Sequence, residues 1–424
     1  MLKPSLGIYL NSYWNQFQSS SMLVNSTYFF INTIIISVFG FLFWWFAIRL
    51  YPANSVGGYV VILSLSQVII VVTSLGLAFG LIRFLPLANN KQKTEFINIV
   101  LTYMGGFTCG LSLVIVVIGL SLFSSTILSH EKLAVFIFPF VVSTSSLFYI
   151  LGQVLVVLKA GKQLVLTNLT TTIGRIILVI ILSPFATSFA LILAFTLPTF
   201  LAVIIIIKSV LPQLISDYVP YLNIRVWYLK SMITYSISSY IGNVLYDLPQ
   251  ILLPQIVANR FGLAGAAYFY AIWSIYSVLV TLGNSISLAL FVEGSHNPTI
   301  LNSLAVKSMG VITAITILLA IIVVFLAKPI LLIFGLDYAD NGVALLRVMA
   351  VAIVPASIVS AKIASLRVKM QLSPIIITFA LIVAINMAVL LISSTNSLES
   401  VGWIWLISQT VALIYLLLFT RSKT

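Results

Sequence analysis

Six ionisable side chains in or beside long apolar runs are the residues of this chain best suited to do chemistry. The clearest is Arg175, about mid-way along the run from Leu164 to Pro184 and far in sequence from any acidic residue. An arginine at the centre of a spanning helix costs about 2.5–3.5 kcal/mol on insertion scales, so it faces the protein interior or water. Either Arg175 meets an anionic substrate in a cavity, or it pairs with a buried acid or with carbonyl groups and locks two helices together.

Asp247 is the only acidic residue deep in an apolar run, within the stretch YIGNVLYDLPQILLPQ. Pro249 and Pro254 follow it, and Asn243 precedes it by one helical turn. Proline interrupts the hydrogen-bond ladder of a helix and frees carbonyl groups. An acid beside such a break can bind H⁺ or Na⁺ and couple transport to an ion gradient. The alternative is an anchor between helices, with Arg175 as the partner.

The other four arginines lie nearer the ends of apolar runs. Arg83 either anchors its run at the membrane surface or reaches into an inward-open cavity. Arg49 and Arg260 occupy corresponding places at the outer edge of two runs, and Arg347 lies about one turn inside a third. Each of these three is typical of an interfacial residue. As a set, five arginines against one aspartate favour an anionic passenger such as a phosphate or pyrophosphate, because arginine binds phosphate oxygens bidentately.

The composition shows which elements must position these residues. The chain has 424 residues, of which 61% are hydrophobic and 7% charged, whereas soluble domains carry about 25% charged residues. Since a spanning helix needs about 20 mostly apolar residues, we predict an all-α polytopic membrane protein with twelve spans. The expected spans are residues 24–48, 56–82, 96–123, 133–158, 164–183, 189–207, 232–257, 264–292, 309–327, 342–361, 373–393 and 401–419.

The distribution of lysine and arginine predicts how these spans are oriented. With a cytoplasmic N-terminus, the outer loops hold only Arg49, Lys132, Arg260 and Lys328. Apart from two arginines within spans, all the other basic residues fall on the cytoplasmic side, as the positive-inside rule requires. We therefore expect both termini on the inner side of the cell (cytoplasmic) membrane.

The spans divide into two halves of six. We predict an interfacial N-terminal segment at 1–23, a first lobe at 24–207, a cytoplasmic linker at 208–231 and a second lobe at 232–424. The stretches GGYVVILSLSQVIIVVTSLG and AAYFYAIWSIYSVLVTLG, in corresponding places of the two halves, indicate a parallel repeat. Such a bundle places a cavity between its lobes near the midplane, which favours a transporter with alternating access over a channel or an enzyme.

Several other functions are excluded. The single cysteine, Cys109, rules out an internal disulfide and a cysteine-rich metal site. The sequence has no complete Walker A motif, so ATP hydrolysis by this chain is not expected. We expect no metal site and no cofactor. The net charge of +13 fits cytoplasmic loops beside anionic membrane lipids and does not call for a nucleic-acid partner.

Three stretches, in this order, resemble Wzx-type polysaccharide flippases of the multidrug/oligosaccharidyl-lipid/polysaccharide exporter superfamily. RLYPANSVGGYVVILSLSQVIIVVTSLGLAFGLIRFLP, from Arg49, resembles the first two helices of that family. DLPQILLPQIVANRFGLAGAAYF, from Asp247, resembles its seventh and eighth helices, and PILLIFGLDYADNGVALLRVMA, from Pro329, its ninth-to-tenth junction. The chain departs from the pattern in having two glycines, Gly57 and Gly58, where one is usual, and in replacing a second-half glycine by alanine.

This resemblance implies a role in polysaccharide biosynthesis. The expected activity is a flippase, not an enzyme, that moves polyprenyl-(pyro)phosphate-linked oligosaccharide from the cytoplasmic to the outer leaflet by alternating access, coupled to an H⁺ or cation gradient. It also implies a cationic cavity, which Arg175 fits.

Two other functions remain alternatives. A multidrug or small-molecule exporter of the same superfamily would more naturally have an acidic cavity. A membrane glycan polymerase or glycosyltransferase would usually carry its catalytic residues on a large extracytoplasmic loop. The best acidic candidate here is LDYADN, from Leu336, and its loop is expected to be short. A lipid II flippase usually has fourteen spans, two more than we predict.

Overall fold

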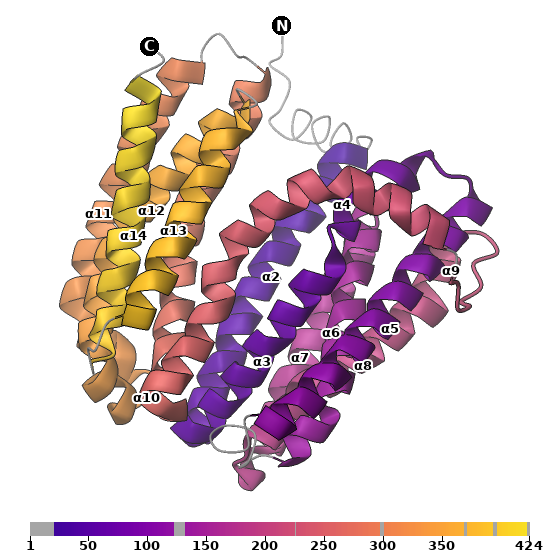
Figure 1. The fold of residues 1–424 in the computed structure, drawn as a ribbon, viewed down its shortest axis with the longest axis horizontal. Helices are drawn as coiled ribbons and strands as arrows, with labels where there is room; N and C mark the ends of the chain where they lie inside the picture. The colour runs from indigo at the N-terminus through magenta and orange to yellow at the C-terminus, as the bar shows by residue number, and fades with distance from the viewer. Residues whose placement is uncertain are drawn as a thin grey trace, which may run out of the picture. The chain divides into compact units, whose positions relative to one another are not determined.

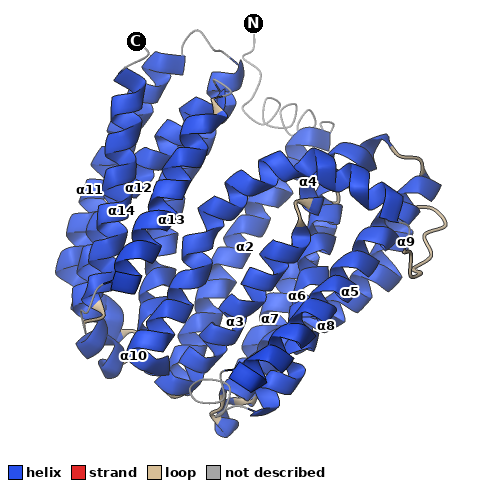
Figure 2. Ribbon diagram, in the orientation of Figure 1, coloured by secondary structure: helices blue, strands red, loops and turns tan. Residues whose placement is uncertain are grey.

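A computed structural model of the chain describes residues 21–122, 132–224, 226–296, 301–368, 371–392 and 397–421. These residues form helices joined by short turns, and none of them lies in a strand (Figure 2). The all-α prediction is confirmed. Most of the predicted interfacial segment, residues 1–20, lies outside the described residues.

Ten helices within the described ranges are long and apolar enough to cross a membrane. Two shorter apolar helices, Leu77–Leu87 and Ser373–Met387, add to them. The chain is therefore a multi-pass membrane protein, as its composition requires. The orientation of its termini stays a prediction.

The chain folds as two compact units. The first unit takes in residues as far as Phe43, then Val72–Pro184 and Ile192–Ile237. It therefore contains the first part of α2, all of five other helices and most of α8 (Figure 1). The bounds of these helices are α2 Ser21–Leu50, α4 Leu77–Phe84, α5 Asn90–Leu122, α6 Lys132–Val157, α7 Gly161–Ile181, α8 Ser188–Ile205 and α9 Leu211–Leu214.

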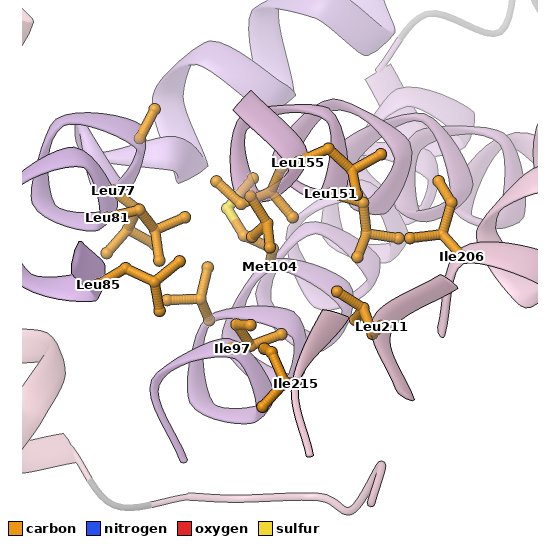
Figure 3. Packing of buried hydrophobic residues seen from close by; sticks show 14 of the residues in the cluster. Leu77, Leu81, Leu85, Ile97, Met104, Leu151, Leu155, Ile206, Leu211 and Ile215 are labelled. Atoms are coloured by element: carbon orange, nitrogen blue, oxygen red, sulfur yellow. The ribbon is translucent and has the colours of Figure 1, made fainter. Parts of the chain in front are cut away.

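A buried apolar cluster holds the first unit together (Figure 3). Leu77, Leu81 and Leu85 contribute one face of α4 and the 3₁₀ turn that follows it, because side chains four positions apart lie on the same side of a helix. The other labelled members come from α5, α6, the π-helical turn Ile206–Val210, α9 and the residue after it: Ile97, Met104, Leu151, Leu155, Ile206, Leu211 and Ile215.

The second unit takes in Trp44–Val71, Phe185–Leu191 and Ser238–Thr424. Part of the predicted first lobe thus packs in this unit, while the lobe boundaries and the repeat stay predictions. Within it α12 packs against α11 and α14, and α14 packs against α13 (Figure 1). Its helices are most of α3 (Ala53–Ser74), most of α10 (Val226–His296), α11 (Leu301–Leu332), α12 (Leu336–Val368), α13 (Leu372–Ile392) and α14 (Glu399–Arg421).

Two glycines lie at breaks within long helical stretches. The predicted span 56–82 is interrupted at Leu75 and Gly76, whose φ angles of 43° and 74° lie in the left-handed region, and it forms α3 and α4 instead. The element α10 consists of two helices that meet at Gly262, whose φ of 74° and ψ of 178° are non-helical and are adopted by glycine at little cost. Gly262 lies in the gap between the predicted spans 232–257 and 264–292.

Candidate functional site

Arg175 lies in the membrane-spanning helix α7 of the first unit and is partly exposed. Its Nη2 group donates a hydrogen bond of 2.8 Å to Oγ1 of Thr199 on α8. The Thr199 hydroxyl in turn donates to the carbonyl oxygen of Phe195, one turn earlier on α8. This relay fixes the side of α7 from which the guanidinium projects.

Two aromatic rings lie close to the guanidinium of Arg175. The Cζ atom of Arg175 lies 3.7 Å from the centroid of the Phe195 ring and 6.0 Å from that of Phe148 on α6. A cation over an aromatic face is attracted by the ring quadrupole, with about 0.5–2 kcal/mol in favourable cases. Helices α7 and α8 approach closely here, because a Cβ atom on Gly174 would lie 3.1 Å from Pro198.

Other polar side chains continue along α7 towards its N-terminus. Asn168 donates a hydrogen bond of 2.7 Å to Asn32 of α2, which joins these two helices across the first unit. The hydroxyls of Thr171 and Thr172 donate to backbone carbonyls of their own helix. The spacing of Asn168, Thr172 and Arg175 places them on one side of α7, so a polar stripe leads to the arginine.

Asp247 is half-buried on α10 in the second unit. Two turns further along α10, Gln255 donates hydrogen bonds of 2.6 Å to the carbonyl oxygen of Val61 and to the hydroxyl of the buried Ser64, both on α3. Pro249 and Pro254 are buried in the same stretch. The side chain of Asn243 lies outside the described residues. The assignment of Asp247 and Asn243 to ion coupling therefore stays a prediction.

The doubled glycine in the first half has a structural reason. A Cβ atom on Gly57 would overlap the backbone carbonyl of Leu263, so α3 and α10 meet there with no side chain between them. A Cβ atom on Gly58 would lie 2.5 Å from the hydroxyl of Ser188 at the start of α8. Each glycine thus accommodates a different neighbour within the second unit.

The remaining four arginines are all exposed and are divided between the units. Arg83 ends α4 in the first unit, while Arg49 ends α2 and Arg260 precedes the Gly262 kink in the second. The helix that carries Arg347 begins earlier than predicted, at Leu336 instead of residue 342, so Arg347 lies about three turns from its start.

The backbone of α11 stabilises the side chain of Arg347. Its Nε donates a hydrogen bond of 3.2 Å to the carbonyl oxygen of Val324. The five arginines are divided between the two units. Their role in binding substrate stays a prediction.

Sequence reasoning did not identify several polar groups that the structure places inside the bundles. Thr199, next to Arg175, and the pair Asn386–Ser408, joined at 2.9 Å between α13 and α14, are the main ones. The sequence does show each of them as a polar residue within an apolar run. This pattern is only a weak indication of a functional position, because threonine and serine hydroxyls can hydrogen-bond to their own helix backbone and so occur in spans at little cost.

The fold matches those of solved transporters. The structure of the lipid II flippase MurJ, in an inward closed conformation, is similar with a TM-score of 0.77 and 13% identity, covering 94% of this chain and 87% of that one. A multidrug resistance MATE transporter in an inward-facing conformation gives 0.68 and 14%, covering 91% and 94%. No protein-family model matches the chain, and no curated protein matches its sequence.

A third similar structure is a transporter with another kind of binding pocket. A transporter from Pyrococcus furiosus, described as having a binding pocket of reverse polarity that suggests a different function, gives a TM-score of 0.56 and 14% identity, with 95% of each chain covered. It and the MATE transporter belong to the multidrug/oligosaccharidyl-lipid/polysaccharide exporter (MOP) superfamily. The chain therefore has the fold of MOP-superfamily transporters. All three proteins are transporters or flippases, and their fold hosts both lipid and multidrug substrates.

Proposed function

We propose that this chain is a flippase that moves polyprenyl-(pyro)phosphate-linked oligosaccharide from the cytoplasmic to the outer leaflet by alternating access. The likeness to MurJ, a flippase of a lipid-linked substrate, supports a substrate with a lipid carrier. The motifs shared with Wzx-type flippases support an oligosaccharide on that carrier. The polyprenyl tail stays in lipid while the polar head crosses.

The observation that carries this proposal is the setting of Arg175. A cation within a spanning helix marks a substrate or ion pathway by default. Here the guanidinium is oriented from two sides, by the hydroxyl of Thr199 and by the ring of Phe195, and it is still partly exposed. A phosphate oxygen pair fits the planar fork of an arginine, so an oriented, accessible guanidinium suits a phosphate or pyrophosphate headgroup.

Ion coupling forms the second part of the proposal. Asp247 would bind H⁺ or Na⁺ on α10, with Asn243 one turn earlier. The half-buried position of Asp247 in a spanning helix supports this role, because an intramembrane carboxyl is expensive unless it serves a function.

The test is a translocation assay in liposomes with a fluorescent polyprenyl-pyrophosphate oligosaccharide. Arg175→Ala should abolish translocation while the protein still inserts in normal amount, and Arg175→Lys should retain only a part because lysine lacks the planar fork. Lys328→Ala, which removes an exposed cation outside any span centre, is the control. Translocation at the wild-type rate by Arg175→Ala would overturn the role of Arg175. In the same assay Asp247→Asn should lose its dependence on an imposed H⁺ or Na⁺ gradient.

A multidrug or small-molecule exporter is the second candidate, because MATE transporters share the fold. The arginines weigh against it, since a cationic drug would be repelled by them. Saturable binding of a cationic dye, in the absence of binding of the lipid-linked oligosaccharide, would favour this candidate.

A further inference from the structure

The segment that follows α9 is not helical, yet it is firmly attached to α5. Asn98 of α5 donates a hydrogen bond of 2.8 Å to the carbonyl oxygen of Val219 and accepts one of 3.0 Å from the hydroxyl of Tyr218. One turn further along α5, Thr102 accepts a hydrogen bond of 3.0 Å from the backbone N–H of Asn223. The side chains of Asn98, Tyr218 and Asn223 are all buried.

These attachments place the segment at the edge of the hydrocarbon layer. The first turns of α5 carry Lys91, Lys93 and Glu95, which do not enter hydrocarbon at acceptable cost. The apolar part of the span therefore begins after Glu95. At 1.5 Å per residue, Asn98 lies about 4.5 Å beyond Glu95, and Thr102 lies about 10 Å beyond it. Irregular backbone at such depth must be satisfied by protein, which is what Asn98 and Thr102 provide.

In the second part of the segment, residues 219–224, the exposed side chains are apolar or aromatic. Leu222 is 84% exposed and Ile224 83%, and Val219 and Tyr221 are exposed as well. The opposite pattern, with apolar side chains inward and polar ones outward, is expected of a loop in water. The segment is thus suited to acyl chains and not to the aqueous phase.

Basic residues surround this segment at the same end of the first unit. Several helix ends meet here, because one apolar cluster joins the start of α5, the end of α6, the start of α7 and α9. Its members from these helices are Ile97, Leu155, Leu164 and Leu211. Among the described residues, the exposed basic side chains at this end include Lys91, Lys159, Lys162 and Lys208. One exposed acid, Asp217, lies on the segment itself. The exposed charged side chains at this end therefore carry a net positive charge, which complements an anionic surface.

We propose that residues 216–224 form a lipid-binding surface that inserts its apolar side chains among acyl chains, while the lysines at that end bind the phosphates of anionic phospholipids. This role is separate from substrate binding, since it uses none of the residues assigned to translocation. Each lysine near an anionic bilayer contributes about fivefold in affinity.

Depth-dependent quenching tests the insertion. In a Cys109→Ser background, Leu222→Cys and Ser216→Cys each carry an environment-sensitive fluorophore, and the protein is reconstituted with phospholipid brominated on its acyl chains. The label at 222 should be quenched much more strongly than the label at 216, since Ser216 is an exposed polar position of the same segment. Equal quenching at both positions, whether strong or weak, would overturn the insertion.

Retention of lipid through native mass spectrometry tests the headgroup preference. The wild-type protein should retain phosphatidylglycerol in preference to phosphatidylcholine. Lys159→Gln combined with Lys162→Gln should lower that preference by about twenty-five-fold. Lys328→Gln, a matched loss of one exposed lysine in the second unit, should leave it unchanged. An unaltered preference in the double variant would overturn the proposal, as would inhibition by free phosphate alone without any effect of the lipid headgroup.

Discussion

The hydroxyl of Thr199 and the ring of Phe195 both orient the side chain of Arg175. The hydroxyl of Thr199 sets the position of one guanidinium edge, and the ring of Phe195 sets its plane. Phe148 is farther from the charge by more than two ångströms on the same measure, which limits its share of the interaction. Because the two distances differ, substituting each ring in turn should affect the orientation of Arg175 to different extents.

We therefore expect Phe195→Leu to reduce the translocation rate more than Phe148→Leu. The physical reason is the loss of about 0.5–2 kcal/mol of cation–π attraction that orients the arginine, which corresponds to a rate lower by roughly 2- to 30-fold. Initial rates in liposomes, normalised to inserted protein, provide the measurement. A larger loss from Phe148→Leu would contradict this assignment.

Between helices, α3 and α10 of the second unit approach each other very closely at Gly57. Because a Cβ atom there would overlap backbone and not the end of a flexible side chain, the two helices cannot accommodate it by a rotamer change. The departure from the usual single glycine is thus a packing requirement.

Gly57→Ala should lower the thermal unfolding midpoint, with a cost of about 1–3 kcal/mol or more from overpacking. Gly152→Ala on α6 is the matched control, since a Cβ atom there meets nothing within 4 Å, and it should be neutral or stabilising by about 0.5–1 kcal/mol because alanine favours helix. The midpoints of the two variants in the same detergent decide the comparison. Equal midpoints would show that α3 and α10 separate easily.

The link between α5 and the segment after α9 depends on Tyr218. Burial raises the pKa of Tyr218 above its ordinary value of 10.0, so its hydroxyl donates to Asn98 throughout the neutral range. Since the folded-state pKa is the higher one, this stabilisation is fully present below about pH 10 and is lost as the pH rises towards the folded-state pKa.

Tyr218→Phe should accordingly increase the proteolytic sensitivity of residues 216–224 at neutral pH. The expected cost is about 1–3 kcal/mol, because Asn98 would be left with a buried acceptor. Limited proteolysis of wild type and variant at pH 7.5 and again above pH 10 provides the measurement. The difference between the two proteins should shrink at the higher pH, and a constant difference would contradict the role of the hydroxyl.

For the chain as a whole, the direction of transport depends on an orientation that the distribution of basic residues predicts. In a Cys109→Ser background, Lys162→Cys at the start of α7 should react with a membrane-impermeant maleimide only from the cytoplasmic side. Asp340→Cys at the start of α12 should react only from outside, since an odd number of predicted spans separates the two positions. The reverse pattern, measured on intact cells and inside-out vesicles, would contradict the predicted direction.

The sequence predicted where the spans lie better than where they break. Apolar length specifies a spanning helix directly, and the described helices coincide with the expected spans within a few residues in most cases. The break at Gly262 falls in the gap between two predicted spans, whereas the break at Gly76 could not be anticipated, because a glycine in an apolar run serves equally for helix packing and for a change of direction. The environment of Arg175 was also out of reach, since Thr199 and Phe195 meet it only once α7 and α8 pack.

The kink in α10 has a consequence for biosynthesis. The two helices of this element meet at Gly262, and only the short polar stretch of Asn259 and Arg260 lies just before it. A translocon that inserts the first helix therefore holds little polar chain before the second helix emerges. We expect the two helices to enter the membrane as a pair.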